Sequence, residues 1–187
     1  MQVKQGGFSL VGVLVAMAST GLMMSMLMTS TSSVIALHRA GREGQGLTRG
    51  AAALHSYLKL HGVAIVTGGG VDGFVDPYRP TMVELKAKTF LPSFMPNITP
   101  FGGTLNFTVR RGAQNDLLGL VCDTVSITEG GVVSPQMAGQ VIAAAKGGLR
   151  TSIADPNTLN GAAFTSIPSP INGPAIVCAW AYVPNPV

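Results

Sequence analysis

The sequence predicts an α+β fold in which one long N-terminal helix packs on a small antiparallel-sheet head. Three observations indicate it. Residues 5–37 carry no ionisable side chain, an amphipathic helical pattern follows over residues 38–62, and short alternating strands fill residues 63–187. The chain has 187 residues, of which 47% are hydrophobic and 11% charged, with 24 glycines and 12 prolines. That composition fits one helix plus a single loop-rich domain.

The first half of the predicted helix, residues 8–37, is long enough to cross a membrane. It would extend about 45 Å at 1.5 Å per residue, whereas about 20 apolar residues span a bilayer. The polar but uncharged stretch 29–33 places the end of the hydrocarbon portion near Met28. We therefore expect a hydrophobic transmembrane or core helix over 8–37.

The second half, residues 38–62, is predicted to continue this helix with one apolar face. Gly62 and the run 68–70 are then expected to end it. Arg49, Ser56 and Lys59 lie off the apolar face. The residues on that face recur every three or four positions: Leu47, Ala51, Leu54, Leu58 and His61.

The head is predicted to contain two short helices. Thr81 and Glu84 have the spacing of a capping box, which predicts a helix over 81–89. Ser134 followed by Pro135 is typical of a helix start, and Gly147 is a natural stop.

Three strands are predicted between and after these helices. Leu105 to Arg110 alternates apolar and polar side chains, 117–128 forms a second strand, and 175–183 forms the last. Gly130 and Gly131 predict a tight turn, and residues 68–80 and 92–103 are expected to be loops.

Two cysteines, Cys122 and Cys178, stand far apart in the sequence. In an exported chain such a pair predicts one disulfide, whereas in a cytosolic chain the pair would be two buried thiols. A bridge closing a loop of about 57 residues would stabilise the fold by roughly 4 kcal/mol.

Charge and motif content argue against nucleic-acid binding and catalysis. The net charge is +4, and the only dense basic positions are Arg110–Arg111 and Lys86 with Lys88, which do not form a clustered basic face. The three histidines lack metal-ligand spacing, and no nucleophile motif occurs. We therefore predict no enzyme, no cofactor and no nucleic-acid partner.

One loop gives a weak indication of a metal site. Asp155, Asn157 and Asn160 bring three oxygen-bearing side chains together, and calcium prefers oxygen ligands. The stretch lacks the terminal carboxylate and the spacing of a known calcium loop, so an Asx-turn loop is the alternative.

The N-terminus resembles that of type IV pilins and pseudopilins. A short leader with Lys4 ends in Gly6-Gly7, and Phe8 opens the uncharged run. The resemblance implies that a prepilin peptidase removes residues 1–7, cleaves between Gly7 and Phe8, and methylates Phe8. Two alternatives stay open: a plain membrane anchor, and a secretory signal cleaved after Ala16–Ala18.

Gly12 occupies the position at which most pilins carry a glutamate. In the family this glutamate is thought to neutralise a neighbouring subunit's terminal amine, and certain minor subunits that start or cap the filament lack it. A buried carboxylate without a partner is costly in a membrane. Gly12 is therefore typical of a minor or tip subunit, and we expect it to affect assembly.

Residues 80–150 resemble the N-terminal region of the minor tip pilins of type IVb conjugative pili, the shufflon-type adhesins. The likeness rests on the order of motifs in this region, which include Phe90-Leu-Pro92 and Asn97-Ile-Thr-Pro-Phe-Gly102 before the strand ending in Arg110-Arg111. It implies a minor or tip-proximal pilin that serves adhesion or cell–cell contact in conjugation.

This resemblance implies where the protein resides and what it meets. The head would lie in the periplasm on an inner-membrane anchor and later in an extracellular pilus. Its partners would be other pilin subunits, the prepilin peptidase, the inner membrane and a receptor on a host or recipient cell. A type II secretion pseudopilin and a membrane-anchored periplasmic binding module are the alternatives.

Overall fold

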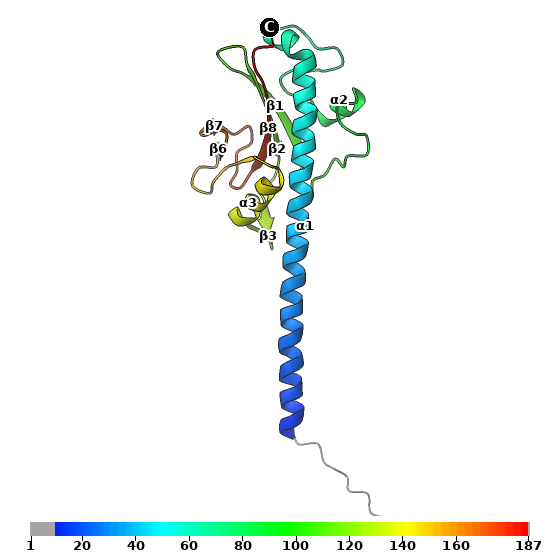
Figure 1. The fold of residues 1–187 in the computed structure, drawn as a ribbon, viewed down its shortest axis with the longest axis vertical. Coiled ribbons are helices and arrows are strands. Elements are labelled where there is room, and N and C mark those ends of the chain that lie inside the picture. Colours follow the sequence, from blue (N-terminus) through cyan, green and yellow to red (C-terminus); the bar gives the residue numbers. More distant parts are fainter. Residues whose placement is uncertain (1–9, 187) are drawn as a thin grey trace, which may run out of the picture. The chain divides into compact units, whose positions relative to one another are not determined.

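The computed structural model describes the backbone of residues 10–186 and the side chains of residues 34–186, and it has an α+β fold. The first helix, α1, is assigned from Leu10 to Thr67. By their internal contacts the residues divide into two units, 1–36 and 37–187. The second unit is drawn in the upper part of Figure 1.

Most of the predicted membrane segment, residues 8–37, lies outside the residues whose side chains are described. Among the described residues, no helix combines the length and the apolar character needed to cross a membrane.

The second half of α1 carries the predicted apolar face. Leu47, Leu54 and Leu58 are fully buried, whereas Arg49 and Lys59 on the opposite side are exposed. The prediction is confirmed for these three leucines, whereas Ala51 and His61 on the same predicted face are only half-buried. Since side chains three and four positions apart share one helix face, a single stripe of α1 provides the core contact.

The helix does not end at Gly62 but continues to Thr67. Ile65 is fully buried, so the apolar stripe extends one more turn. A Cβ atom on Gly62 would lie 2.8 Å from the Cβ of Pro186, so this glycine admits the C-terminal segment rather than stopping the helix. The stop is Gly68, which has a φ of +76° and donates its N–H to the carbonyl of Ile65.

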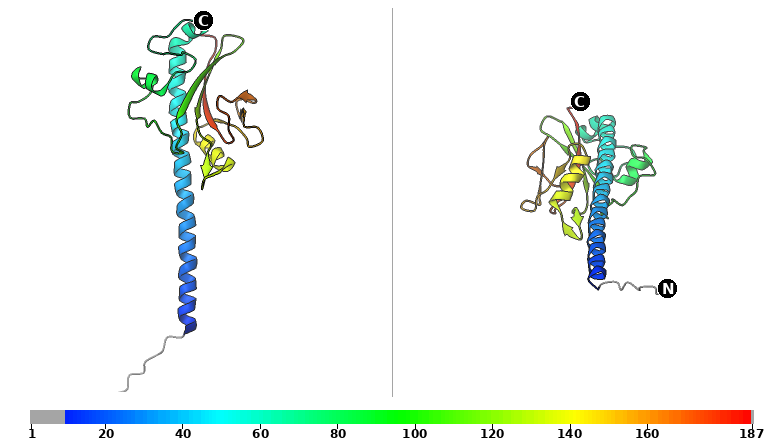
Figure 2. Two further views of the ribbon diagram at one scale, coloured as in Figure 1. Left: turned by 180° about the vertical axis from the view of Figure 1, so that it is seen from behind. Right: turned by 60° about the horizontal axis from the view of Figure 1, so that its bottom comes forward.

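The main sheet has six strands, hydrogen-bonded in the order β1-β2-β8-β5-β6-β7, and every pairing in it is antiparallel. Its central strands pack beside α1, and β6 and β7 lie farther from the helix (Figures 1 and 2). The strands are β1 (Leu105–Arg111), β2 (Leu117–Asp123), β5 (Leu149–Arg150), β6 (Thr158–Gly161), β7 (Ile167–Pro168) and β8 (Val177–Val183). A separate hairpin joins β3 (Thr128–Glu129) to β4 (Val132–Val133) around the predicted glycine turn.

The two faces of the sheet bury different cores. On one face the strands approach α1 closely, because a Cβ on Gly119 would lie 2.5 Å from Leu54 and a Cβ on Gly50 would lie 2.8 Å from Val121. The opposite face contributes to a second cluster of buried side chains: Leu120, Cys122, Leu149, Leu159, Ile176 and Cys178. The sheet is therefore covered on both sides at its centre.

Both short helices of the head form near the predicted positions. Helix α2 (Met82–Ala87) begins with the expected capping box between Thr81 and Glu84. Helix α3 (Pro135–Ala144) has Ser134 as its N-cap and turns Met137 and Val141 into the core. In both views of Figure 2, α2 and the sheet lie on opposite sides of α1.

The second predicted strand, 117–128, is too long. Strand β2 ends at Asp123, whose carboxylate accepts the backbone N–H of Val125. This local hydrogen bond bends the chain out of the sheet. The last strand likewise begins at Val177 rather than at Ala175, because Ala175 has a positive φ of 53°.

Candidate functional site

The sequence-predicted processing residues Gly7 and Phe8 lie outside the described residues. Gly12 falls within α1, in the part of the helix whose side-chain surroundings are not described. Their predicted roles in cleavage, methylation and assembly stay predictions.

Cys122 and Cys178 form the disulfide that the sequence predicted as one of two possibilities. They are directly opposite each other on β2 and β8, and both side chains are fully buried. The bridge therefore joins adjacent strands at the centre of the sheet.

In the loop with Asp155, Asn157 and Asn160, two of the three oxygen-bearing side chains accept backbone hydrogen bonds. The carboxylate of Asp155 accepts the N–H of Asn157 at 3.3 Å, which forms an Asx turn. The side-chain oxygen of Asn160, within β6, accepts the N–H of Ser166 at 3.0 Å. Each of these contacts organises the local backbone.

Within the described part of the chain, no group of three or more His, Cys, Asp or Glu side chains is arranged to hold a metal ion. The fold instead buries two carboxyl groups, on Glu43 of α1 and on Asp123 at the end of β2. Glu43 is 1% exposed and Asp123 is 0% exposed. Carboxyl groups are almost never buried to this degree unless they are paired or bound.

The two carboxyls differ in their hydrogen bonding. Asp123 Oδ2 accepts the hydroxyl hydrogen of Thr99 at 2.8 Å, and Oδ1 accepts the N–H of Val125 at 3.2 Å. In contrast, both carboxyl oxygens of Glu43 are buried and accept no hydrogen bond from any residue that the structure describes. Glu43 is thus the unsatisfied member of the pair.

A tight turn over residues 99–103 holds Thr99 against Asp123. The N–H of Thr99 donates to the carbonyl of Gly103 at 2.8 Å, and the N–H of Gly103 donates back to the Thr99 hydroxyl at 3.1 Å. A Cβ on Gly103 would lie 2.0 Å from Asp123 Oδ1, so only glycine leaves room for this carboxylate.

Arg39, one turn before Glu43 on α1, fixes the same turn to the helix. Its Nη2 donates to the carbonyl of Pro100 at 2.8 Å, and its guanidinium lies 4.8 Å from the centre of the Phe101 ring. The contact therefore combines a charge-assisted hydrogen bond with a cation–π interaction.

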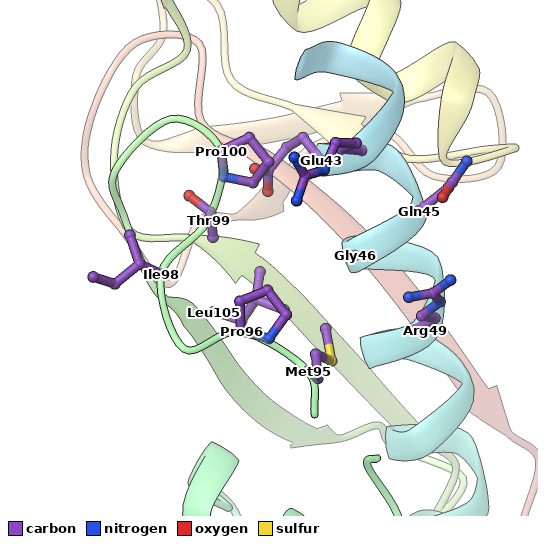
Figure 3. A pocket seen from close by; sticks show the side chains of 11 residues that line it. Glu43, Gln45, Gly46, Arg49, Met95, Pro96, Ile98, Thr99, Pro100 and Leu105 are labelled. Atoms are coloured by element: carbon purple, nitrogen blue, oxygen red, sulfur yellow. The ribbon is translucent and has the colours of Figure 1, made fainter. Parts of the chain in front are cut away.

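A pocket of about 340 Å³ opens beside the carboxyl pair. One wall is the α1 segment from Arg42 to Arg49, and the opposite wall is the loop from Met95 to Pro100, with Glu43, Thr99 and Pro100 close together at one end (Figure 3). The pocket therefore borders Glu43 and Thr99, whereas Asp123 lies behind them and does not line it.

Burial governs the protonation of the pair. Burial, and after it the charge of Asp123, together raise the pKa of Glu43 to about 8. Burial also raises the pKa of Asp123, against the hydrogen bonds from Thr99 and Val125, which lower it. At neutral pH the isolated pair therefore holds one proton, as two adjacent buried carboxyls generally must.

The sequence contained signals for this site that the reasoning from motifs missed. Glu43 lies four residues, about one helical turn, before Leu47 and therefore on the buried face of α1. Asp123 follows the buried strand residue Cys122 and shares the strand face of Val121, which packs on α1. When an acidic residue lies on each of two apolar faces that pack together, the pattern indicates a buried pair of carboxyls.

Comparison with known proteins identifies no relative. No protein-family model, no curated protein and no solved structure matches the chain.

Proposed function

We propose that the chain is a minor or tip-proximal subunit of a type IV pilus-like filament, serving adhesion or cell–cell contact in conjugation. The proposal rests on one observation, the Gly6-Gly7-Phe8 junction followed by residues without charge as far as Leu37. In the pilin class this junction is the cleavage site of the prepilin peptidase, and the uncharged segment packs between subunits. Gly12 in place of the usual glutamate favours a terminal position over that of a bulk subunit.

The packing of the head is consistent with this role. A helix whose C-terminal part is buried on one stripe packs on an antiparallel sheet stapled by a disulfide. Disulfides persist in oxidising compartments such as the periplasm and the cell surface. The disulfide in this head supports the proposal that the head resides outside the cytoplasm.

Exposed apolar side chains of α1 offer a contact for neighbouring subunits. The exposed fractions of Val34, Ile35 and Leu37 are 63%, 62% and 52%. Such residues on one helix are suited to packing against the helices of other subunits. In the proposed filament they would become buried on assembly.

Terminal sequencing and mass measurement of the protein, expressed with and without a prepilin peptidase, test the proposal. We expect a methylated chain that begins at Phe8 only when the peptidase is present. Retention of Met1 in both cases would favour a plain anchor, and a start at Ser19 would favour a secretory signal.

A matched pair of variants locates the cleavage. Gly7→Val places a bulky side chain immediately before the proposed scissile bond and should abolish processing. Gly6→Ala changes the preceding residue only slightly and should be processed. Equal processing of both variants would contradict the proposal.

Detection of the subunit in sheared surface filaments separates a pilus tip from a secretion pseudopilus. We expect trace amounts, since a terminal subunit is rare in each filament. Absence from surface filaments combined with normal Phe8 processing would instead favour the pseudopilin.

A further inference from the structure

The carboxyl of Glu43 is buried beside Asp123 and Thr99 with room for a further partner. Its side chain is 1% exposed, and neither oxygen accepts a hydrogen bond within the described residues. A buried polar group without a hydrogen bond is destabilising, and an ionised one is more so. Asp123, with which Glu43 interacts, adds repulsion when both are ionised. A cation between the two carboxylates would take the place of the proton that they otherwise hold at neutral pH, and it would offset both penalties.

We propose that Glu43, Asp123 and Thr99 form a binding site for a divalent cation of the calcium class. The site joins α1 to the end of β2 and to the turn over residues 99–103. It is distinct from the Asp155 loop that the sequence indicated.

The residues present supply the ligand types that such an ion prefers. Both oxygens of Glu43 are free for a bidentate contact, and Asp123 contributes a second carboxylate. Thr99 donates its hydroxyl hydrogen to Asp123 and accepts one N–H from Gly103, which leaves a lone pair on its oxygen. Two carboxylates and a hydroxyl give a hard, all-oxygen donor set with a formal charge of −2.

The pocket completes the coordination. Calcium takes 6–8 oxygen ligands, more than these three side chains offer. The pocket of about 340 Å³ is lined by Glu43 and Thr99, so it can supply water ligands and an entry path. A site that depends on waters favours moderate affinity, and we expect a Kd of about 10⁻⁴–10⁻³ M, as in extracellular modules.

Nearby cations do not already neutralise the pair. Arg39 donates to the carbonyl of Pro100 and lies against Phe101. Arg42 and Arg49 line the pocket but form no ion pair among the described residues, where the only salt bridge joins Lys88 to Asp72. These arginines lower the affinity for a cation, which is a further reason to expect millimolar rather than micromolar binding.

The test is a calcium titration of the full chain in detergent, starting from chelator-treated protein at neutral pH. Thermal unfolding and isothermal titration calorimetry are the measurements. At calcium about tenfold above Kd, the Tm should rise by roughly 3–6 °C. No rise in Tm and no heat of binding up to about 10 mM calcium would overturn the proposal and leave the pair sharing a proton.

Two variants locate the ion. Glu43→Gln keeps the side chain's shape and removes its charge, so it should fold without calcium and lose at least tenfold in affinity. Asp155→Asn alters the loop indicated by the sequence and should bind calcium as the wild type does. Loss of binding in Asp155→Asn with retention in Glu43→Gln would overturn the proposal in favour of that loop.

Discussion

Cys122 and Cys178 are directly opposite each other on β2 and β8, with their Cα atoms 4.0 Å apart and their side chains joined in a disulfide. The bridge lies within the core cluster that also contains Leu120 and Leu149. It therefore closes a long loop of the chain and contributes to packing on the sheet face away from α1.

Removing this bridge should destabilise the head. We expect Cys122→Ser with Cys178→Ser to lower the free energy of unfolding by about 2–5 kcal/mol, because the unfolded chain regains the entropy of the open loop and two polar hydroxyls replace buried sulfur. Urea unfolding of the wild type and the variant, each with and without reductant, checks it. Reductant should lower the stability of the wild type only; an equal effect on both would contradict the assignment.

Contact between α1 and α3 depends on Gly44. A Cβ there would lie 2.6 Å from the Cβ of Ala144 and 2.7 Å from the carbonyl oxygen of Val141. Gly44→Ala should therefore cost about 1–3 kcal/mol through overpacking, because backbone atoms cannot yield as a flexible side chain would. Thermal and urea unfolding measure the cost.

Gly46 is the matched control for this prediction. A Cβ at Gly46 meets nothing within 4 Å. Gly46→Ala should gain up to about 1 kcal/mol from the higher helix propensity of alanine. If both substitutions stabilise the protein, the result would contradict the close packing of α3 against Gly44.

Stability should fall as the pH rises from about 5 to about 8 in chelator. The pKa of Glu43 is raised to about 8 in the folded protein, above its ordinary value of 4.5, so the folded state binds more protons in this window. Each pH unit then removes at most about 1.4 kcal/mol through this group. The stabilising proton is fully retained below pH 4.5 and lost above pH 8.

Glu43→Gln isolates this contribution. In this variant the unfolding free energy should fall much less between about pH 5 and about pH 8. The unfolding free energy of the wild type should therefore decrease relative to that of the variant as the pH rises. The groups that interact with the Glu43 carboxyl, Asp123 and Thr99, are unchanged in the variant, as are Arg42 and Arg49, which line the pocket. Parallel pH profiles would refute the link to Glu43.

The capping box of α2 gives a fourth prediction. The hydroxyl of Thr81 accepts the N–H of Glu84 at 3.2 Å, and the carboxylate of Glu84 accepts the N–H of Thr81 at 2.7 Å. Thr81→Ala should cost about 1 kcal/mol, whereas Thr81→Ser, which keeps the hydroxyl, should cost little. Urea unfolding compares the two; equal losses would show that the methyl group matters more than the cap.

Local patterns predicted the parts of the fold that local physics decides. The apolar stripe of α1 around Leu54, the cap at Thr81 and the start of α3 at Ser134 all depend on residues within a few positions of one another. The predicted ends of helices and strands were less accurate where a segment distant in sequence packs against them. Gly62 resembles a helix stop in sequence, yet it provides space for Pro186.

The sequence by itself determined the α+β class, the helix face, the caps and the residues able to form one disulfide. Tertiary structure decided which side chains meet across the fold. It paired Cys122 with Cys178 across adjacent strands and buried Glu43 beside Asp123. Hydrogen bonds and periodicity within one element are local in sequence, whereas these partners lie far apart in the chain. The two cysteines meet when β2 pairs with β8, and Glu43 meets Asp123 when α1 docks on the sheet.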